Sequence, residues 1–183
     1  QVLTNLLESG SRIVCHHTVY VWTKEILNTY LAKFGVEVAY VDMTDLDQLR
    51  NAVKKKTDVI YFEPFANPTL DVIDVKSAIE IGKAAGGIVV VDNTFLTPYL
   101  LRPLDMGADI VLHSATKYLC GHGDTLAGII VSKTEEMGHQ IDHIRNAYGG
   151  ILSPQNAFLL LRGIKTLPVR MKLHCSNAQS VAE

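Results

Sequence analysis

The sequence has few cysteines, little excess charge and no long apolar segment, and each shortage excludes a class of protein. The 183 residues include three cysteines, Cys15, Cys120 and Cys175, which are odd in number and far apart. They suit neither a disulfide framework nor a cysteine-based metal site, so we expect free thiols in a reducing compartment. The 17 basic and 19 acidic residues leave a net charge of −2, which gives no electrostatic support for a nucleic-acid partner or an anionic membrane.

Targeting and membrane signals are not evident either. No apolar stretch reaches the length needed to span a bilayer, and residues 1–8 contain neither a basic leader nor a small-residue cleavage site. We therefore expect a cytoplasmic protein. A chain of this length with 48% hydrophobic residues can bury one good core, which predicts a single domain.

Short apolar runs alternate with helical patterns along most of the chain. One helix is predicted at 46–53 with Asp45 as its cap, another at 75–85 after Asp74, and the pattern is helical again after Pro154. This alternation predicts an α/β sandwich with a mostly parallel sheet. The runs expected as strands are Ile13–Cys15, Val36–Val41, Val59–Phe62, Ile88–Val91, Ile110–Leu112 and Ala127–Val131.

Polar side chains follow two of these runs. Asp92-Asn93-Thr94 comes after the run 88–91, and Ser114-Ala115-Thr116-Lys117 comes after the run 109–112. Both runs are short, β-branched and without polar alternation, which is typical of buried parallel strands. Ligands of open α/β sheets bind at the carboxyl ends of such strands. We therefore expect both polar segments to line one crevice.

These side chains are suited to holding pyridoxal phosphate. A carboxylate such as Asp92 keeps a pyridine nitrogen protonated, and the cationic ring can then accept an electron pair from the substrate α-carbon. The Lys117 amine can bond covalently to the cofactor aldehyde and later carry protons as a free base. In an extended segment, Ser114 and Thr116 would donate hydrogen bonds to a phosphate from one side, while Lys117 would point the opposite way, toward the ring.

Each residue alone has a simpler explanation. An aspartate after a strand is commonly a turn or cap residue, and a single lysine is commonly a solvated charge. Their order and shared position at strand ends favour a cofactor site over these explanations. Lys165 and Lys172 are weaker candidates for the covalent lysine because both lie on helical patterns away from strand ends.

Two further motifs carry little weight. Gly121-His122-Gly123, followed by Gly128, lacks the spacing and position of a dinucleotide-binding glycine loop. His139 and His143 are four residues apart on a predicted helix, but no acidic residue follows His139 and no third ligand is evident. We expect no metal site and interpret this histidine pair as part of a solvated helix face.

The chain resembles the Cys/Met metabolism family of pyridoxal phosphate enzymes over nearly its whole length. Within that family it is most similar to the methionine γ-lyase branch. The resemblance implies a three-layer α/β sandwich, the large cofactor-binding domain of the fold-type I, aspartate aminotransferase-like enzymes. The family segments are Val41–Met43, Val59–Glu63, Ala66–Thr69, Val91–Thr94 and His113–Tyr118, and those that indicate the branch are Gly121–Asp124, Leu161–Leu167 and His174–Gln179.

The resemblance assigns roles to the polar residues already described. It makes Lys117 the lysine that holds the cofactor covalently and Asp92 the partner of the pyridine nitrogen. Ser114 and Thr116 become phosphate ligands, in agreement with the interpretation from the residues alone.

It also adds two residues to the site. Tyr20 would lie against the cofactor ring and help the leaving group depart, tasks that suit a flat aromatic side chain with a phenol. Without the family match, Tyr20 would be taken for an ordinary half-buried aromatic. Asn67 would lie near the ring hydroxyl.

The sequence departs from the family pattern at two places. A small residue that the family has beside the cofactor, which is often cysteine in methionine γ-lyases, is replaced by Trp22, so we expect an indole to reshape the pocket. The family proline after Glu63 stands one place earlier, at Pro64, and proline restricts its neighbours. We expect the approach of the chain to Asn67 to differ as well.

The activity implied by the resemblance is γ-elimination of L-methionine to methanethiol, 2-oxobutanoate and ammonia. Cystathionine γ-lyase, cystathionine γ-synthase and O-acetylhomoserine sulfhydrylase share the cofactor residues and remain alternatives. A truncated, non-catalytic module is a further alternative from another class. The family is usually homotetrameric, with active sites built across a dimer interface.

The chain opens on Gln1 and stops at Glu183 inside a helical pattern, so we expect a fragment. On this interpretation, residues 1–183 form the central part of the cofactor-binding domain. Residues 154–183 would begin the helical connection to a further domain. In the family that domain supplies the arginine that binds the substrate carboxylate, and we assign none of Arg102, Arg162 and Arg170 to that role.

Overall fold

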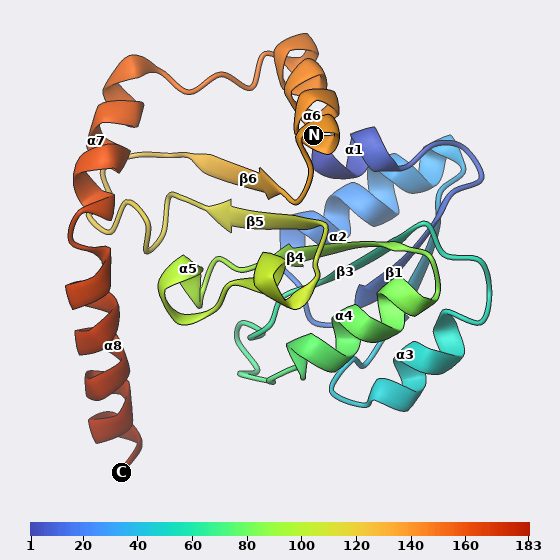
Figure 1. Cartoon of the computed structure of the whole chain (residues 1–183), viewed down its shortest axis with the longest axis horizontal. Helices are drawn as coiled ribbons and strands as arrows, with labels where there is room; N and C mark the ends of the chain where they lie inside the picture. The colour runs from blue at the N-terminus through green and yellow to red at the C-terminus, as the bar shows by residue number, and fades with distance from the viewer.

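One six-stranded sheet lies between two layers of helices in the computed structural model, which describes residues 1–183 (Figure 1). The strand order is β2-β1-β3-β4-β5-β6. The first five strands in that order are parallel, and only β6 runs antiparallel to its neighbour. The mostly parallel α/β sandwich predicted from the sequence is confirmed. The strands are β1 (Arg12–His16), β2 (Glu37–Val41), β3 (Val59–Phe62), β4 (Ile88–Asp92), β5 (Ile110–Ser114) and β6 (Gly128–Ser132).

The sheet is covered on both faces because successive side chains of a strand point to opposite sides. On β1, Ile13 and Cys15 belong to one core, and Val14 belongs to the other. The first core lies under α1 (Val2–Leu6), α6 (Glu135–Tyr148) and the π-helical segment η1 (Ile26–Leu31). The second lies under α3 (Leu46–Ala52) and α4 (Val75–Ala84).

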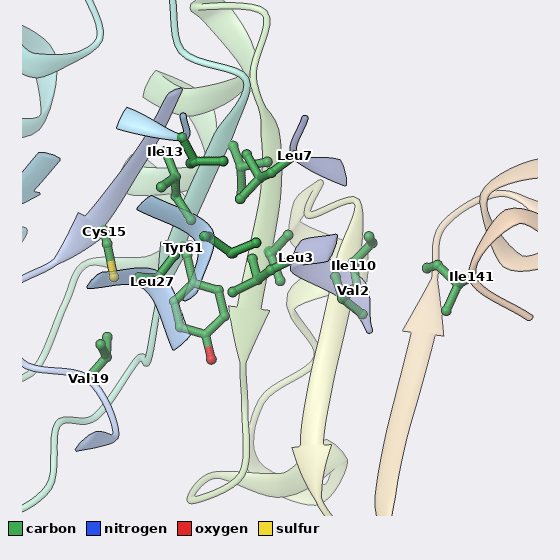
Figure 2. Packing of buried hydrophobic residues seen from close by; sticks show 14 residues of the cluster. Val2, Leu3, Leu7, Ile13, Cys15, Val19, Leu27, Tyr61, Ile110 and Ile141 are labelled. Atoms are coloured by element: carbon green, nitrogen blue, oxygen red, sulfur yellow. The ribbon is translucent and has the colours of Figure 1, made fainter. Parts of the chain in front are cut away.

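The first core reaches the edge of the sheet where the polar residues gather. Figure 2 shows Leu3 and Leu27 from the helices beside Ile13, Tyr61 and Ile110 from the strands. Tyr61 is almost fully buried, so its ring packs in this core while its hydroxyl can serve a polar neighbour. The packing of Tyr61 in this core therefore fixes the position of the carboxyl end of β3.

Helix starts follow the capping residues that the sequence offers. The Asp45 side chain accepts a hydrogen bond from Asp47 N at the start of α3, and Asp74 accepts from Ser77 N at the start of α4. Both predicted caps are confirmed. Ser153 caps α7 (Pro154–Ile164) in the same way, with a proline at the first helical position.

A third, smaller core attaches the last two helices to the end of β5. Leu160 from α7 and Met171 from α8 (Leu167–Ala182) pack against Ala115, Leu119 and Cys120. Figure 1 shows α7 and α8 along one side of the sheet, with α8 extending past it. The remaining short elements are α2 (Val21–Glu25), η2 (Ala32–Phe34), α5 (Thr97–Leu100) and η3 (Pro103–Met106). No helix has the combination of length and apolarity that a membrane span needs.

Candidate functional site

The carboxyl ends of neighbouring strands deliver polar side chains to one edge of the sheet. Glu63 follows β3 directly, Asp92 ends β4 and Ser114 ends β5, while Tyr20 lies in the loop between β1 and α2. A cavity of about 920 Å³ lies at this edge. Every residue that the sequence indicated for the site lines this cavity: Tyr20, Asn67, Asp92, Ser114, Thr116 and Lys117.

Asp92 is held by hydrogen bonds to both of its carboxylate oxygens. Oδ1 accepts from the backbone N of Thr94 at 3.1 Å and also from the Thr94 hydroxyl. Oδ2 accepts from the Tyr61 hydroxyl at 3.3 Å, and burial together with the Asp92 charge raises the pKa of Tyr61 well above its usual value. Tyr61 therefore stays a hydrogen-bond donor to the carboxylate. Oδ2, with one long bond, retains capacity to accept another from a group in the cavity.

Thr94 links the ends of two strands. Its hydroxyl donates to Asp92 and accepts from the backbone N of Ser114 at 2.8 Å. The strand pairing between β4 and β5 ends beside this bond, at Asp92 and Leu112. The Thr94 hydroxyl thereby fixes the position of Ser114 relative to the Asp92 carboxylate.

The segment after Ser114 turns, so the extended geometry predicted from the sequence is wrong. Lys117 N donates to Ser114 O at 3.1 Å, and Gly121 N donates to Lys117 O at 2.8 Å. The turn forms because Ala115 and Cys120 bury their side chains against α7 and α8. Ser114 and Thr116 still line the same cavity as Lys117. They reach it through the turn, whereas the sequence predicted that they reach it through the alternation of side chains along a strand.

The Thr116 hydroxyl is already paired with the protein backbone. It donates to Ala127 O at 3.2 Å and accepts from Ala127 N at 3.0 Å. These bonds fasten the Lys117 turn to the segment that leads into β6. A hydroxyl has a single proton, so Thr116 can donate to a phosphate only by releasing Ala127 O.

Lys117 has an exposed side chain that makes no hydrogen bond and no ion pair within the chain. Its amine is therefore free to react with a group in the cavity. Lys165 and Lys172, the weaker candidates, are exposed on the last helices and do not line the cavity.

Arg170 of α8 secures the far side of the turn that follows Lys117. Its guanidinium donates to Tyr118 O at 2.7 Å and to Gly163 O at 3.0 Å. Gly121 has a φ of +76°, which favours glycine, and a side chain there would displace the Arg170 guanidinium. The Gly121-His122-Gly123 motif is thus a turn that accommodates Arg170.

Glu63, which the sequence analysis did not assign, is the buried acid of the cavity. Its Oε1 accepts from the backbone N of Tyr20 at 2.6 Å. Burial and then the charge of Asp92 raise the pKa of Glu63 to about 7, against the opposing effect of the Tyr20 hydrogen bond. The glutamate stood within a quoted family segment, but only the fold shows that it reaches Tyr20 across 43 positions of sequence.

The two departures from the family pattern have smaller consequences than expected. Trp22 is 62% exposed and does not line the cavity in this chain, whereas its neighbour Val21 does. The expectation that the indole reshapes this pocket is therefore wrong within residues 1–183. Asn67 lines the cavity despite the earlier proline at Pro64, so the chain still brings it to the site.

The histidines predicted to form a solvated helix face are exposed on α6, where His139 lies 3.4 Å from Glu135. The structure gathers a different set, His16, His17 and Asp42, with potential ligand atoms within 4.8 Å of one another. Nδ1 of His16 is occupied there, because it accepts from Met43 N at 3.0 Å. The other ring nitrogen of His16, Nε2, is buried and has no hydrogen-bond partner.

The cavity fits pyridoxal phosphate by the chemistry of its groups. It offers an anchored carboxylate with spare acceptor capacity, the Ser114 hydroxyl as a donor for a phosphate and an unpaired amine. A second cavity, of about 660 Å³, lies beyond Asp92 and Ser114 between α1 and α6, and both residues line it as well. The two hollows therefore meet at the same polar edge.

Comparison with known proteins gives one consistent result. The sequence profile described as Cys/Met metabolism PLP-dependent enzyme matches residues 1–183. L-methionine gamma-lyase of Pseudomonas putida is 46% identical over 182 residues, which are 99% of this chain and 46% of that protein. Cystathionine beta-lyase of Lactococcus lactis is 45% identical over 179 residues, covering 98% of this chain and 47% of that protein.

Solved structures agree with the sequence relatives. The crystal structure of cystathionine gamma-lyase from Lactobacillus plantarum complexed with L-serine superposes with a TM-score of 0.94 at 39% identity, over 98% of this chain and 47% of that one. The chain thus spans about half the length of the relatives it matches.

Proposed function

Because the chain belongs to the Cys/Met metabolism family of pyridoxal phosphate-dependent enzymes, we propose that its gene product is a carbon–sulfur lyase acting on sulfur-containing amino acids. One observation carries this proposal. A reactive amine, an anchored carboxylate, two hydroxyls, an amide and a phenol line a single cavity at the carboxyl edge of the sheet. Single structural roles do not account for all of these groups meeting there.

The residues have distinct tasks in the proposed reaction. Bound pyridoxal phosphate supplies an electron sink next to the substrate α-carbon. Asp92 would keep the pyridine nitrogen protonated, and the Lys117 amine would hold the cofactor and act as the base for the α-proton. Ser114 would bind the phosphate, Thr116 would join it on releasing Ala127 O, and Asn67 would lie near the ring hydroxyl.

Tyr20 is the proposed acid for the leaving group. Its phenol can give a proton to the sulfur as the bond to the γ-carbon breaks. With L-methionine as substrate, elimination and addition of one water give methanethiol, 2-oxobutanoate and ammonia. The reaction is balanced, and no oxidant or reductant is needed.

The second candidate substrate is cystathionine. The methionine and cystathionine lyases quoted above are 46% and 45% identical to this chain, so similarity alone does not separate them. Both candidates would use the same cofactor residues, and they differ in the thiol that leaves and in whether the bond to sulfur breaks at the β- or the γ-carbon. Cystathionine γ-synthase and O-acetylhomoserine sulfhydrylase chemistry would need an added thiol.

The deciding experiment compares substrates directly. The complete gene product is loaded with pyridoxal phosphate and given methionine or cystathionine at equal concentration, and keto acid and thiol release are followed. Faster methanethiol release from methionine supports the γ-lyase proposal. Preference for cystathionine, or no turnover without an added thiol, moves the protein to another branch. Failure to bind the cofactor at all would favour a non-catalytic module.

We also propose a homotetramer with sites completed across a dimer interface. In its support, large apolar side chains stand exposed on and beside α2 and η1, namely Tyr20, Val21, Trp22, Tyr30 and Phe34. Light scattering on the complete gene product tests the assembly. We also propose a cytoplasmic location, which the three free cysteines support. We further propose that residues 154–183 lead to a further domain, which the exposed length of α8 supports.

A further inference from the structure

Glu63 is a buried carboxylate that the proposed reaction does not use. It is 7% exposed, lies immediately after β3 and lines the cavity with Tyr20, Asp92 and Lys117. Pro64 restricts the residue before it to extended backbone, so Glu63 continues the direction of the strand into the site. A buried acid that only filled space would be costly, because burial of a charged group is unfavourable without partners.

Its one hydrogen bond goes to the residue proposed as the acid. The backbone N of Tyr20 donates to Glu63 Oε1 at 2.6 Å. Tyr20 is the N-cap of α2, with a non-helical backbone at φ −48° and ψ 133°. Its side chain is 55% exposed and makes no hydrogen bond within the chain. The Tyr20 carbonyl accepts from Thr23 N and Lys24 N within α2, so the bond to Glu63 is the hydrogen bond that ties Tyr20 to the end of β3.

We propose that Glu63 is a positioning residue whose carboxylate fixes the backbone of Tyr20 at the start of α2 and thereby sets where the phenol stands over the cofactor site. This inference rests on the proposed function of Tyr20. It adds that the position of the Tyr20 side chain depends on whether Glu63 is ionised.

The surroundings of Glu63 explain why its charge state can change near neutral pH. Asp92 faces it from β4, Tyr61 lies two positions earlier on β3, and Cys15 interacts with it from β1. Lys24 of α2 acts on Cys15, and Lys117, Arg170 and His174 line the same cavity as Glu63. Burial and the Asp92 charge raise the pKa of Glu63 to about 7.

The sign of the effect follows from the hydrogen bond. An ionised acceptor binds an N–H more strongly than a neutral one, so Tyr20 is held best when Glu63 has lost its proton. Activity that depends on this bond should rise as the pH increases through about 7, where Glu63 ionises. A glutamine at this position keeps an acceptor oxygen but stays neutral at every pH.

The first test compares pH profiles of the complete gene product loaded with pyridoxal phosphate. Glu63→Gln should match the parent protein below pH ~6 and lag it by about fivefold above pH ~8, the difference between a charged and a neutral acceptor. Glu63→Ala should lose more at high pH because no acceptor remains. The matched control is Glu80→Gln, because Glu80 is an exposed glutamate of α4 that does not line the cavity. This variant should leave the pH profile of activity unchanged.

The second test does not depend on activity. In the cofactor-free protein at pH ~8, where Glu63 is ionised, hydrogen exchange at the Tyr20 amide should be faster in Glu63→Gln than in the parent protein and fastest in Glu63→Ala, with no change in Glu80→Gln. This readout stands even if the proposed reaction is wrong. Unchanged exchange in the isosteric Glu63→Gln variant, or loss of activity by the same factor at every pH, would overturn the positioning role.

Discussion

Asp92 and Lys117 lie at the same edge of the sheet, yet the protein holds them in opposite ways. Asp92 is fixed through Thr94 and Tyr61, and the latter is anchored in a core. The Lys117 side chain makes no bond at all, although the turn that carries it is fastened at both ends. The difference matches the proposed chemistry. A group that supports a charge needs one position, whereas an amine that takes and releases protons must be free to move.

The largest expected effect comes from removing the free amine. Lys117→Ala should abolish the covalent attachment of pyridoxal phosphate and lower turnover by at least about 10²–10⁴-fold, the usual contribution of a proton-transfer group. The visible absorbance of the bound cofactor and the mass of the reduced, labelled protein measure the attachment. Lys165→Ala, on an exposed helix end, is the control and should behave like the parent protein. An unchanged cofactor spectrum in Lys117→Ala would disprove the assignment.

The next effect comes from removing the anchored carboxylate. Asp92→Ala should still bind the cofactor covalently through Lys117 but turn over roughly 10²–10³-fold more slowly, because the electrostatic support for the ring is lost. Cofactor titration measures binding, and initial rates measure turnover. Lys117 would then be needed for attachment of the cofactor, and Asp92 for the rate of turnover. Near-native turnover in Asp92→Ala would contradict the role of the carboxylate.

The smallest effect comes from loosening the anchor without removing it. Thr94→Val keeps the shape of the side chain but leaves Ser114 N without a partner and Asp92 Oδ1 with only the backbone N of residue 94, which should cost about 1–3 kcal/mol of stability. Urea unfolding of the complete gene product measures the loss. Thr44→Val is a close control, since the Thr44 hydroxyl also donates to an aspartate two residues before it, Asp42, but on the surface. Its expected cost is within about 0.5 kcal/mol. Equal losses of stability in both variants would show that the Thr94 link between β4 and β5 contributes no more than a surface hydrogen bond.

Much of this arrangement could be predicted from local features of the sequence. The β-branched runs indicated strands, Asp45 and Asp74 indicated helix starts, and polar residues at strand ends indicated a common edge. These predictions depend on local periodicity and capping, which a sequence states directly.

The errors and omissions have a common physical cause. The turn at Lys117 depends on Ala115 and Cys120 packing against helices that lie about forty positions or more along the chain, as the third core shows. The Glu63 bond to Tyr20 joins residues 43 positions apart. Trp22 and Val21 are neighbours at the start of α2, and only Val21 lines the cavity, a difference that local spacing does not reveal.

Residue type and local spacing were therefore enough to predict the fold class, the cofactor chemistry and the residues that could perform it, because a sequence carries that information directly. Tertiary packing was needed to establish how Asp92 is anchored, why Lys117 lies in a turn and which acid holds Tyr20. Those features depend on contacts between distant segments, which form only when the sheet brings the ends of its strands together.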